Sequence, residues 1–391
     1  MENVIIVSSS DSGKGIGKEN SLTFLDSLRG FAAVYVMIGH SRWLLWEGYN
    51  PGYLSHISQY TILGKFFVYF LSIFRFGHEA VLFFFVLSGF VIHLKYSKAL
   101  QKNSDYKLDF KVYFFKRLRR IYPPFLLALF FTLLLDSLGK SLGYQIYFGS
   151  TNILVLTQNV KSDISLNTFI GNLLFLQDSI VPVFGSNGPL WSLKFEWWFY
   201  MIYPLLFFIA RKKPLSAFLL IILIAFGISF TFLGLVPMSE VLVYLPCWWL
   251  GCFGADIYTS RINLNKNILI VLPVFLLTMI VLYFFKKPLF VNFAWSSFFF
   301  LIIVVLASIS RKKKLIYLNK FYFLGSFSYT LYVVHFPILV LLSGFIYSRI
   351  KSLPMNFGYF IFGVIGCIII SWGFYFIIEK PFMNSQRNEI N

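Results

Sequence analysis

The chain has 391 residues, of which 58% are hydrophobic and 13% are charged, and its formal net charge is +18. Soluble domains carry about 25% charged residues, so this composition argues against a single water-soluble core and favours the lipid bilayer as the solvent. The basic residues lie in short blocks between apolar runs, which argues against nucleic acid as a partner.

Long apolar runs without period-2 alternation favour helices over a closed barrel, because backbone groups in lipid must satisfy their own hydrogen bonds. A membrane span needs about 20 apolar residues, and we therefore expect an all-α bundle of about ten transmembrane helices. The expected spans are 22–46, 79–96, 121–139, 190–210, 215–235, 240–259, 267–285, 289–309, 325–347 and 357–379. The shorter stretch 60–74 contains Lys65, and we expect an interfacial or re-entrant helix there, with an eleventh span as the alternative.

An excess of lysine and arginine marks cytoplasmic loops. Basic blocks between residues 95 and 120 and at 211–213, 261–266 and 311–314 place both termini in the cytoplasm. The segment 140–189 is then extracytoplasmic. We expect a cytoplasmic tail at 1–21 without a signal peptide, one membrane domain at 22–383, and a second cytoplasmic tail at 384–391.

The first expected helix contains FLDSLRGFAAVYVMIGH, with Arg29 and His40 eleven residues apart. Eleven residues make about three helical turns, so both side chains share one face. Asp26 lies on the same face, and Glu47 would extend this polar stripe. Ionisable groups within a span usually face a protein interior or a wet cavity. The alternative is that Arg29 reaches the headgroups and His40 is an ordinary hydrogen-bonded interior histidine.

The second span opens with FGHEAVLFFFVLSGFVIH, which places His78 and Glu79 at the expected depth of His40. A carboxylate beside a histidine fixes its tautomer, so His78 or Glu79 could orient His40 as a general base. The third span follows FKRLRRIYPPF, whose prolines 123–124 we expect to set the helix start. Arg117 and Arg120 then lie at the cytoplasmic edge, either as membrane anchors or as a binding site for phosphate groups.

Two later segments also carry polar groups. GPLWSLKFEWWFYMIYPLL places Glu196 among aromatic residues, and we expect its partner on another helix. In LGSFSYTLYVVHFPIL, Ser328, Tyr332 and His335 are spaced i, i+4 and i+7 and share one side of a helix. Cys247, Cys252 and Cys367 show neither a disulfide framework nor a zinc-ligand spacing, so no metal is expected.

These segments, together with the closing EKPF, resemble the membrane acyltransferase-3 family in kind and in order, over residues 22 to 383. The resemblance implies transfer of an acyl group, most often acetyl, from cytoplasmic acyl-CoA to a hydroxyl of an extracytoplasmic or lipid-linked glycan at the bacterial cytoplasmic membrane. Arg29 and His40 match the essential pair of the family, and Arg117 and Arg120 match its arginine motif. Fused family members carry a further C-terminal hydrolase-like domain, whereas this sequence stops twelve residues after Glu379. We therefore expect that a mechanism which hands the acyl group to such a domain would need a separate protein.

The resemblance implies that CoA docks on Arg117 and Arg120 with Arg29 nearby. His40 would then act as general base or as transient acyl carrier. Four residues are expected to contact the acceptor: Ser192, Glu196, Ser328 and His335. A transporter or flippase of glycan precursors is the alternative function, and a structural membrane subunit is a third. Of these, a transferase alone would consume acyl-CoA and release free thiol. The sequence does not indicate an oligomeric state.

Overall fold

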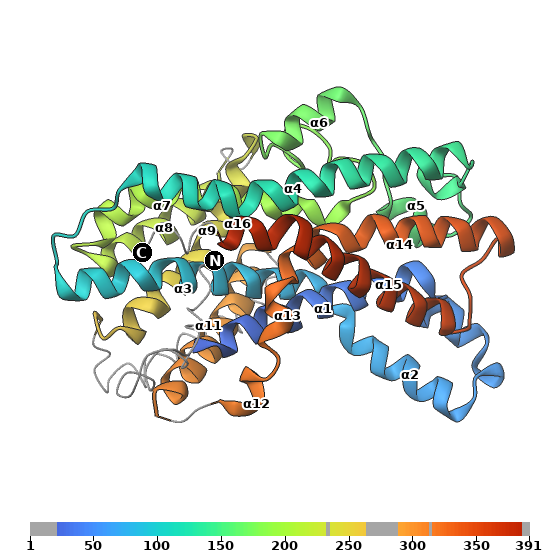
Figure 1. Cartoon of the computed structure of the whole chain (residues 1–391), viewed down its shortest axis with the longest axis horizontal. Helices are drawn as coiled ribbons and strands as arrows, with labels where there is room; N and C mark the ends of the chain where they lie inside the picture. The colour runs from blue at the N-terminus through green and yellow to red at the C-terminus, as the bar shows by residue number, and fades with distance from the viewer. Residues whose placement is uncertain (1–21, 232–234, 263–287, 313–314, 385–391) are drawn as a thin grey trace. The chain divides into compact units, whose positions relative to one another are not determined.

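A computed structural model describes residues 22–231, 235–262, 288–312 and 315–384, and these residues form helices, loops and isolated β-bridges (Figure 1). Among them, seven helices are long and apolar enough to cross a membrane. These are α3 (Gly77–Lys102), α4 (Phe110–Ser141), α7 (Trp191–Ala210) with the preceding turn, α9 (Ser239–Tyr258), α11 (Pro288–Lys312), α14 (Ser328–Ile350) and α15 (Gly358–Phe374) with its continuation. The protein is therefore an all-helical, multi-pass membrane protein.

The remaining elements are shorter or more polar. Helix α1 (Phe24–Leu45) has 22 residues, and α8 (Pro214–Ser229) has 16 and ends before the expected boundary at 235. The expected span 267–285 lies outside the described residues. The short helices are α2 (Ile62–Ser72), α5 (Leu154–Asn159), α6 (Leu166–Leu173), α12 (Ile316–Asn319), α13 (Tyr322–Ser326) and α16 (Lys380–Asn384). Single helical turns are η2 (Gly48–Tyr53), η3 (Ile57–Gln59), η4 (Ile73–Arg75), η5 (Gln145–Phe148), η6 (Gly188–Leu190) and η8 (Tyr375–Glu379).

Helix α2 decides between the two interpretations of residues 60–74. Its 11 residues reach about 16 Å, which is too short for a hydrocarbon core of about 30 Å. Thr61 caps its start by accepting a hydrogen bond from the Gly64 N–H. Its apolar side chains include Ile62 and Phe66, which are 89% and 63% exposed. These features support an interfacial or re-entrant helix and exclude an eleventh span here.

Helix α4 begins earlier than expected. Asp109 accepts a hydrogen bond from the Val112 N–H at 3.0 Å and so caps the helix before Phe110. The prolines at 123 and 124 lie inside the helix, so the expectation that they set its start is wrong. As a result, Arg117 and Arg120 are residues of α4 itself and not of a preceding loop.

The chain divides into two compact units. The first comprises Met1–Gly30, Val81–Arg117 and Phe195–Gly325, and the second comprises Phe31–Ala80, Leu118–Lys194 and Ser326–Asn391. Helices α1, α3, α4, α7 and α13 contribute residues to both units.

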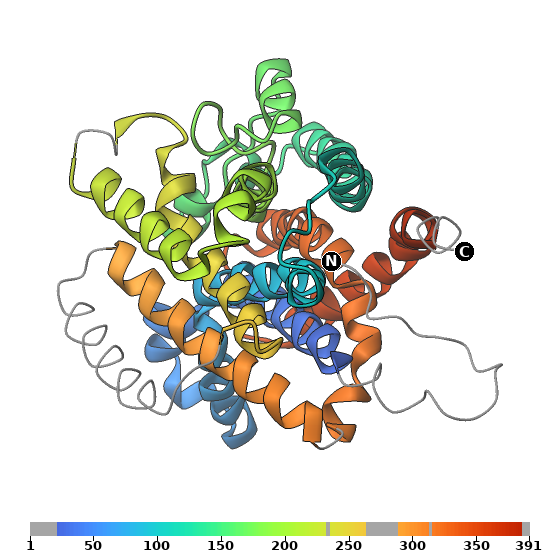
Figure 2. The ribbon, with the colours of Figure 1, turned by 90° about the vertical axis from the view of Figure 1, so that its left-hand side faces the viewer.

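In the first unit, α9 packs against both α8 and α11 (Figure 2). It also meets α3 through a pair of glycines. A Cβ on Gly251 would lie 1.9 Å from the Val86 carbonyl oxygen, and one on Gly89 would lie 2.1 Å from the Trp248 carbonyl oxygen. Because no side chain larger than hydrogen fits, these glycines set the close approach of the two backbones, as small residues do in membrane helix packing.

Gly251→Ala is expected to destabilise the protein by about 1–3 kcal/mol, because the new methyl group must push the α3 backbone away. Gly227→Ala on α8 is the matched control, since a Cβ there meets nothing within 4 Å. Alanine in place of glycine within a helix stabilises the folded protein by about 0.5–1 kcal/mol. Thermal unfolding in detergent measures both variants. Equal melting temperatures for the two would contradict the close α3–α9 contact.

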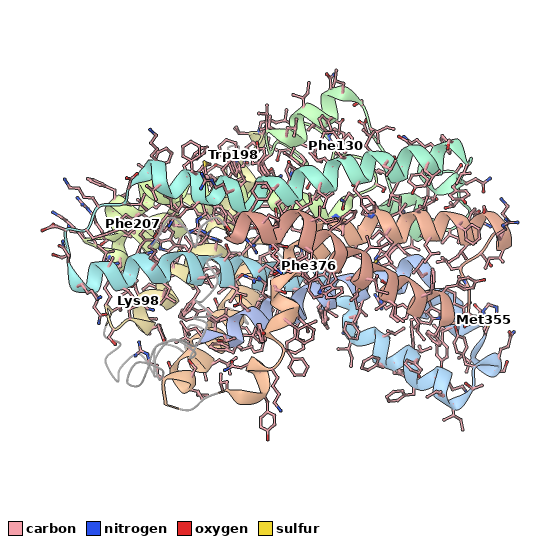
Figure 3. The ribbon with its side chains drawn as sticks, viewed as in Figure 1. Lys98, Phe130, Trp198, Phe207, Met355 and Phe376 are labelled. Carbon is pink, nitrogen blue, oxygen red and sulfur yellow. The ribbon has the colours of Figure 1, made fainter. Side chains whose placement is uncertain are left out.

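In the second unit, α14 packs along α15 (Figure 1). Large apolar side chains point outward from this unit. Phe130 on α4 is 58% exposed and Phe376 in η8 is 43% exposed (Figure 3). Such side chains are costly in water and are suited to contact with lipid chains.

Candidate active site

A pair of hydrogen-bonded histidines lies in the second unit. Nδ1 of His40 on α1 is 2.9 Å from Nε2 of His335 on α14, and the two rings are stacked at an interplanar angle of 11°. Nδ1 of His335 is 2.9 Å from the carbonyl oxygen of Leu331. The Phe336 ring meets the His40 ring edge-on, with centroids 5.0 Å apart. His335 is fully buried, whereas His40 is only partly buried.

The helix that carries His335 is held in place by Asn187. Pro337 has no N–H, so the Val333 carbonyl oxygen loses its partner four residues along the helix. The Nδ2 group of Asn187 donates to that oxygen at 2.8 Å and also to Thr132 Oγ1 at 3.0 Å. The residue is fully buried. Sequence reasoning did not single out Asn187, although a proline within the HFP segment is a signal that a helix carbonyl needs an outside donor.

Asn187→Ala is expected to cost about 1–3 kcal/mol of stability, because the buried Val333 carbonyl is left without a donor. In a Pro337→Ala background the cost should be smaller, since the introduced alanine supplies the missing N–H from within α14. Denaturant unfolding of the four proteins of this double-mutant cycle gives the coupling. Additive effects of the two substitutions would show that Asn187 has no such role.

The first turn of α14 is bound by a buried carboxylate. Oε2 of Glu379 accepts from the N–H of Thr330 at 3.3 Å and from its Oγ1 at 2.6 Å. The first N–H groups of a helix have no partner within the helix and favour negative charge. Oε1 of Glu379 pairs with Nη1 of Arg120 at 2.7 Å, and the Arg120 guanidinium lies 5.7 Å from the ring centre of Tyr329. Arg120, predicted to bind CoA, is thus engaged with a carboxylate of the protein.

Three of the predicted acceptor-binding residues belong to the same part of the second unit. Ser192 Oγ lies 2.7 Å from the Tyr332 hydroxyl, and each of these groups is 3.2 Å from the Pro189 carbonyl oxygen. The Tyr332 ring is 6.1 Å from the ring of His335. Ser328 begins α14 and is buried. The structure therefore places Ser192 next to the helix that holds His335.

The expected partners of His40 on α3 have other surroundings. The His78 ring is stacked on Trp191 with centroids 5.7 Å apart, and Glu79 lies in the first turn of α3. The ring hydrogen bond of His40 goes to His335 instead. The structure thus pairs His40 with a residue that was expected to contact the acceptor.

Arg29 lies in the first unit and is 4% exposed. Its Nη2 donates to the Gly325 carbonyl oxygen at 2.7 Å and lies 2.9 Å from Asp26 Oδ1. The predicted Asp26–Arg29 face is therefore confirmed, and the burial of Arg29 excludes the headgroup-anchoring alternative. Helix α1 ends at Leu45, so Glu47 does not continue the stripe.

Glu47 has partners outside α1. Its Oε1 accepts from the Tyr60 hydroxyl at 2.6 Å, and its Oε2 lies 3.0 Å from Nδ1 of His56. Burial, and then the hydrogen bond to Glu47, raise the pKa of Tyr60 above its ordinary value. Tyr60 therefore stays protonated and keeps its hydrogen bond to the carboxylate over the physiological pH range.

Arg117 and Glu196 lie in the first unit. The Arg117 guanidinium is 5.4 Å and 5.6 Å from the ring centres of Tyr113 and Tyr200, and it is 3% exposed. The Tyr200 hydroxyl donates to Glu196, so this partner of Glu196 lies one turn along α7 and not, as expected, on another helix. Because Pro204 leaves the Tyr200 carbonyl without a helix partner, the Tyr113 hydroxyl donates to it at 3.1 Å.

Sequence reasoning also missed a buried polar network in the first unit. Nε2 of His93 lies 3.0 Å from Asp256 Oδ1, and its Nδ1 lies 2.8 Å from the Tyr203 hydroxyl. Arg261 pairs with the same Asp256 oxygen at 3.0 Å. His93 within an apolar run and Asp256 near the end of another were the available signals, because buried ionisable groups need partners.

The helices and the histidine pair together define a multi-pass membrane protein with a hydrogen-bonded pair of imidazoles in its second unit. The family model described as "Acyltransferase domain" (Acyl_transf_3) matches residues 22–376. The chain belongs to this acyltransferase-3 family.

A curated relative gives a shorter match. The chain is 27% identical over 202 residues to "Putative acetyltransferase ORF330" of Acidianus two-tailed virus. The match covers 50% of this chain and 51% of the relative, so the chain spans about half the length of the curated relative it matches. The comparison with solved structures gives no significant match.

Proposed function

We propose that the protein transfers an acyl group, acetyl in the simplest case, from acyl-CoA to a hydroxyl of a glycan or lipid-linked saccharide. Membership of the acyltransferase-3 family supports acyl transfer. The observation that carries the proposal is the partly exposed His40, whose ring is held by the buried His335 at 2.9 Å. An imidazole whose orientation is fixed by a hydrogen bond is the group that deprotonation of a sugar hydroxyl requires.

In the direct route, His40 takes the proton of the acceptor hydroxyl while the oxygen attacks the thioester carbonyl carbon. The C–S bond breaks, the ester forms, and the thiolate takes the proton from His40 and leaves as CoA thiol. In the alternative route, a His40 nitrogen attacks the thioester carbon, the C–S bond breaks, and CoA leaves as the thiolate. The hydroxyl oxygen then attacks the acyl carbon, the C–N bond breaks, and the hydroxyl proton goes to the thiolate. Both routes return His40 to its neutral state and consume one thioester for each ester formed.

CoA carries phosphates, and arginine forks bind phosphate in a bidentate manner. We propose Arg29, Arg117 and Arg120 as the groups that recognise the donor. Arg29 and Arg120 are paired with Asp26 and Glu379, so their part in donor binding requires sharing or exchange of these partners. For the acceptor we propose Ser192, Glu196 and Ser328, while His335 has the different role argued below.

Release of thiol tests the proposal. The protein in liposomes receives acetyl-CoA and a cell-surface glycan extract, and free thiol and glycan acetylation are both measured. Acetyl transfer with stoichiometric thiol release supports the proposal. Movement of glycan precursor across the bilayer without thiol release would make the protein a transporter. The absence of both activities would favour a structural membrane subunit.

We further propose that the protein lies in a bacterial cytoplasmic membrane with both termini in the cytoplasm, since the basic loops favour this orientation. Lys102 at the end of α3 and Lys161 in the loop after α5 are both exposed, and the sequence assigns them to opposite sides. Single cysteines at these positions, in a variant lacking Cys247, Cys252 and Cys367, are labelled with an impermeant maleimide on intact cells whose outer membrane is permeabilised. The Lys161→Cys variant should react and the Lys102→Cys variant should be protected. The reverse pattern would invert the orientation.

A further inference from the structure

We propose that His335 is a positioning residue that fixes which nitrogen of His40 carries the proton, and that it leaves Nε2 of His40 as the reacting atom. This inference rests on the proposed acyl transfer. It replaces the expectation that His335 contacts the acceptor and that His78 or Glu79 orients His40.

The argument begins at Leu331. Its carbonyl oxygen can only accept a hydrogen bond, so Nδ1 of His335, at 2.9 Å, must carry a hydrogen. A neutral imidazole has one N–H and one lone pair, and an apolar interior favours the uncharged ring. Nε2 of His335 is therefore an acceptor.

The same logic then applies to His40. Its Nδ1 lies 2.9 Å from the accepting Nε2 of His335, so His40 donates through Nδ1–H. In neutral His40 the lone pair is then on Nε2. A hydroxyl can transfer its proton to that nitrogen, and a thioester carbon can be attacked by it, without a prior change of tautomer.

The anchor of this chain is built into α14. Leu331 lies one turn before His335 on the same helix, so the accepting carbonyl keeps its place relative to the ring. Glu379 binds the start of this helix through Thr330, and Asn187 binds the Val333 carbonyl. The rotation of α14 about its axis, which decides where Nε2 of His335 points, is thus fixed from both sides.

The arrangement has the logic of a catalytic triad, in which a third group orients the base. Here the orienting group is a neutral histidine in place of a carboxylate. When Nε2 of His40 takes the substrate proton, its Nδ1–H already points at the His335 lone pair, which stabilises the imidazolium. The proton returns from Nε2 to the leaving thiolate, so His335 needs no net proton transfer.

Nitrogen NMR of the ¹⁵N-histidine-labelled protein in lipid discs reads the tautomer directly. The chain has five histidines, and a His40→Gln variant assigns the His40 signals. We expect the Nδ1–H tautomer of His40 in the unmodified protein. An Nε2–H tautomer there would overturn the proposal, and this tautomer is read on the unmodified protein, with the variant serving only to assign the signals.

Two substitutions then separate positioning from packing. In the His335→Gln variant, the side-chain carbonyl can accept a hydrogen bond from His40 Nδ1–H. In the His335→Leu variant, the side chain fills the space but offers no acceptor. In metal sites, removal of the partner that orients a histidine lowers metal affinity or activity by about 10- to 100-fold. We expect the kcat of His335→Leu to fall by a similar factor, and we expect His40 in this variant to lose its single tautomer. In His335→Gln, the kcat and the single His40 tautomer should both recover in part. An unchanged His40 tautomer in His335→Leu would refute the positioning role.

This test is separable from that of the proposed function. If the protein releases no thiol from any acyl-CoA, acyl transfer is wrong, while the wild-type tautomer still reports on the His40–His335 pair. If acyl transfer occurs and the tautomer differs from Nδ1–H, the positioning role is wrong and the function stands.

Discussion

Replacement of His40 by alanine is expected to lower the turnover of acyl transfer by about 10²–10⁴-fold, the usual contribution of a general acid–base group. The reason is that the imidazole hydrogen-bonded to His335 disappears, while the fold loses one side chain of intermediate burial. Release of CoA thiol in liposomes, followed with acetyl-CoA and acceptor both saturating, gives the change in kcat.

His56→Ala is the matched control for that experiment. His56 is a histidine of the second unit whose side chain is 39% exposed and whose ring contacts Glu47 rather than His335. We expect nearly normal turnover from this variant. Turnover by correctly inserted His40→Ala protein equal to that of the control would remove His40 from the reaction.

Glu379→Ala is expected to cost about 3–5 kcal/mol of stability, because removing one partner leaves the other buried charge uncompensated. Two groups lose their acceptor at once, namely the Arg120 guanidinium and the first turn of α14 at Thr330. The free energy of unfolding in detergent, measured with a denaturant, gives the size of the loss. A denaturant unfolding curve like that of the unmodified protein would show that the Arg120–Glu379 pair does not stabilise the fold.

The same pair allows the two roles of Arg120 to be separated. In a double-mutant cycle, Arg120→Ala and Glu379→Ala should be strongly non-additive in stability, because each removes the same contact. A role of Arg120 in donor binding would show as a rise in KM for acyl-CoA when Arg120→Ala is added to the Glu379→Ala protein. A KM that does not change on that addition would confine Arg120 to its contact with Glu379.

Much of the helical framework could be predicted from hydropathy. The expected spans 190–210, 240–259 and 289–309 agree closely with α7, α9 and α11, because a continuous apolar run largely determines where a helix can lie in lipid. The start of α4 was not predicted because the basic residues in its first turns lower the local hydropathy, although Asp109 is a typical N-cap residue. Hydropathy cannot detect a helix that extends beyond the apolar region.

The candidate site was predictable only within each helix. Periodicity correctly paired Asp26 with Arg29, since they are three residues apart on α1. The contact between His40 and His335 joins residues 295 positions apart. Helical spacing indicates which face a residue occupies, but it does not indicate which other helix faces it. For this reason His335 was assigned to the acceptor, and α3 was expected to supply the partner of His40.

The proline in α14 also has a consequence for how the chain is made. Asn187 and Val333 are 146 residues apart, and domains form first at the N-terminal end during synthesis. An unsatisfied backbone group in lipid costs several kcal/mol, so we expect α14 to be fully paired only after it reaches Asn187, which is synthesised earlier. Correct assembly of the helix that carries His335 should therefore depend on Asn187, and the order of translation supplies that partner before α14 is made.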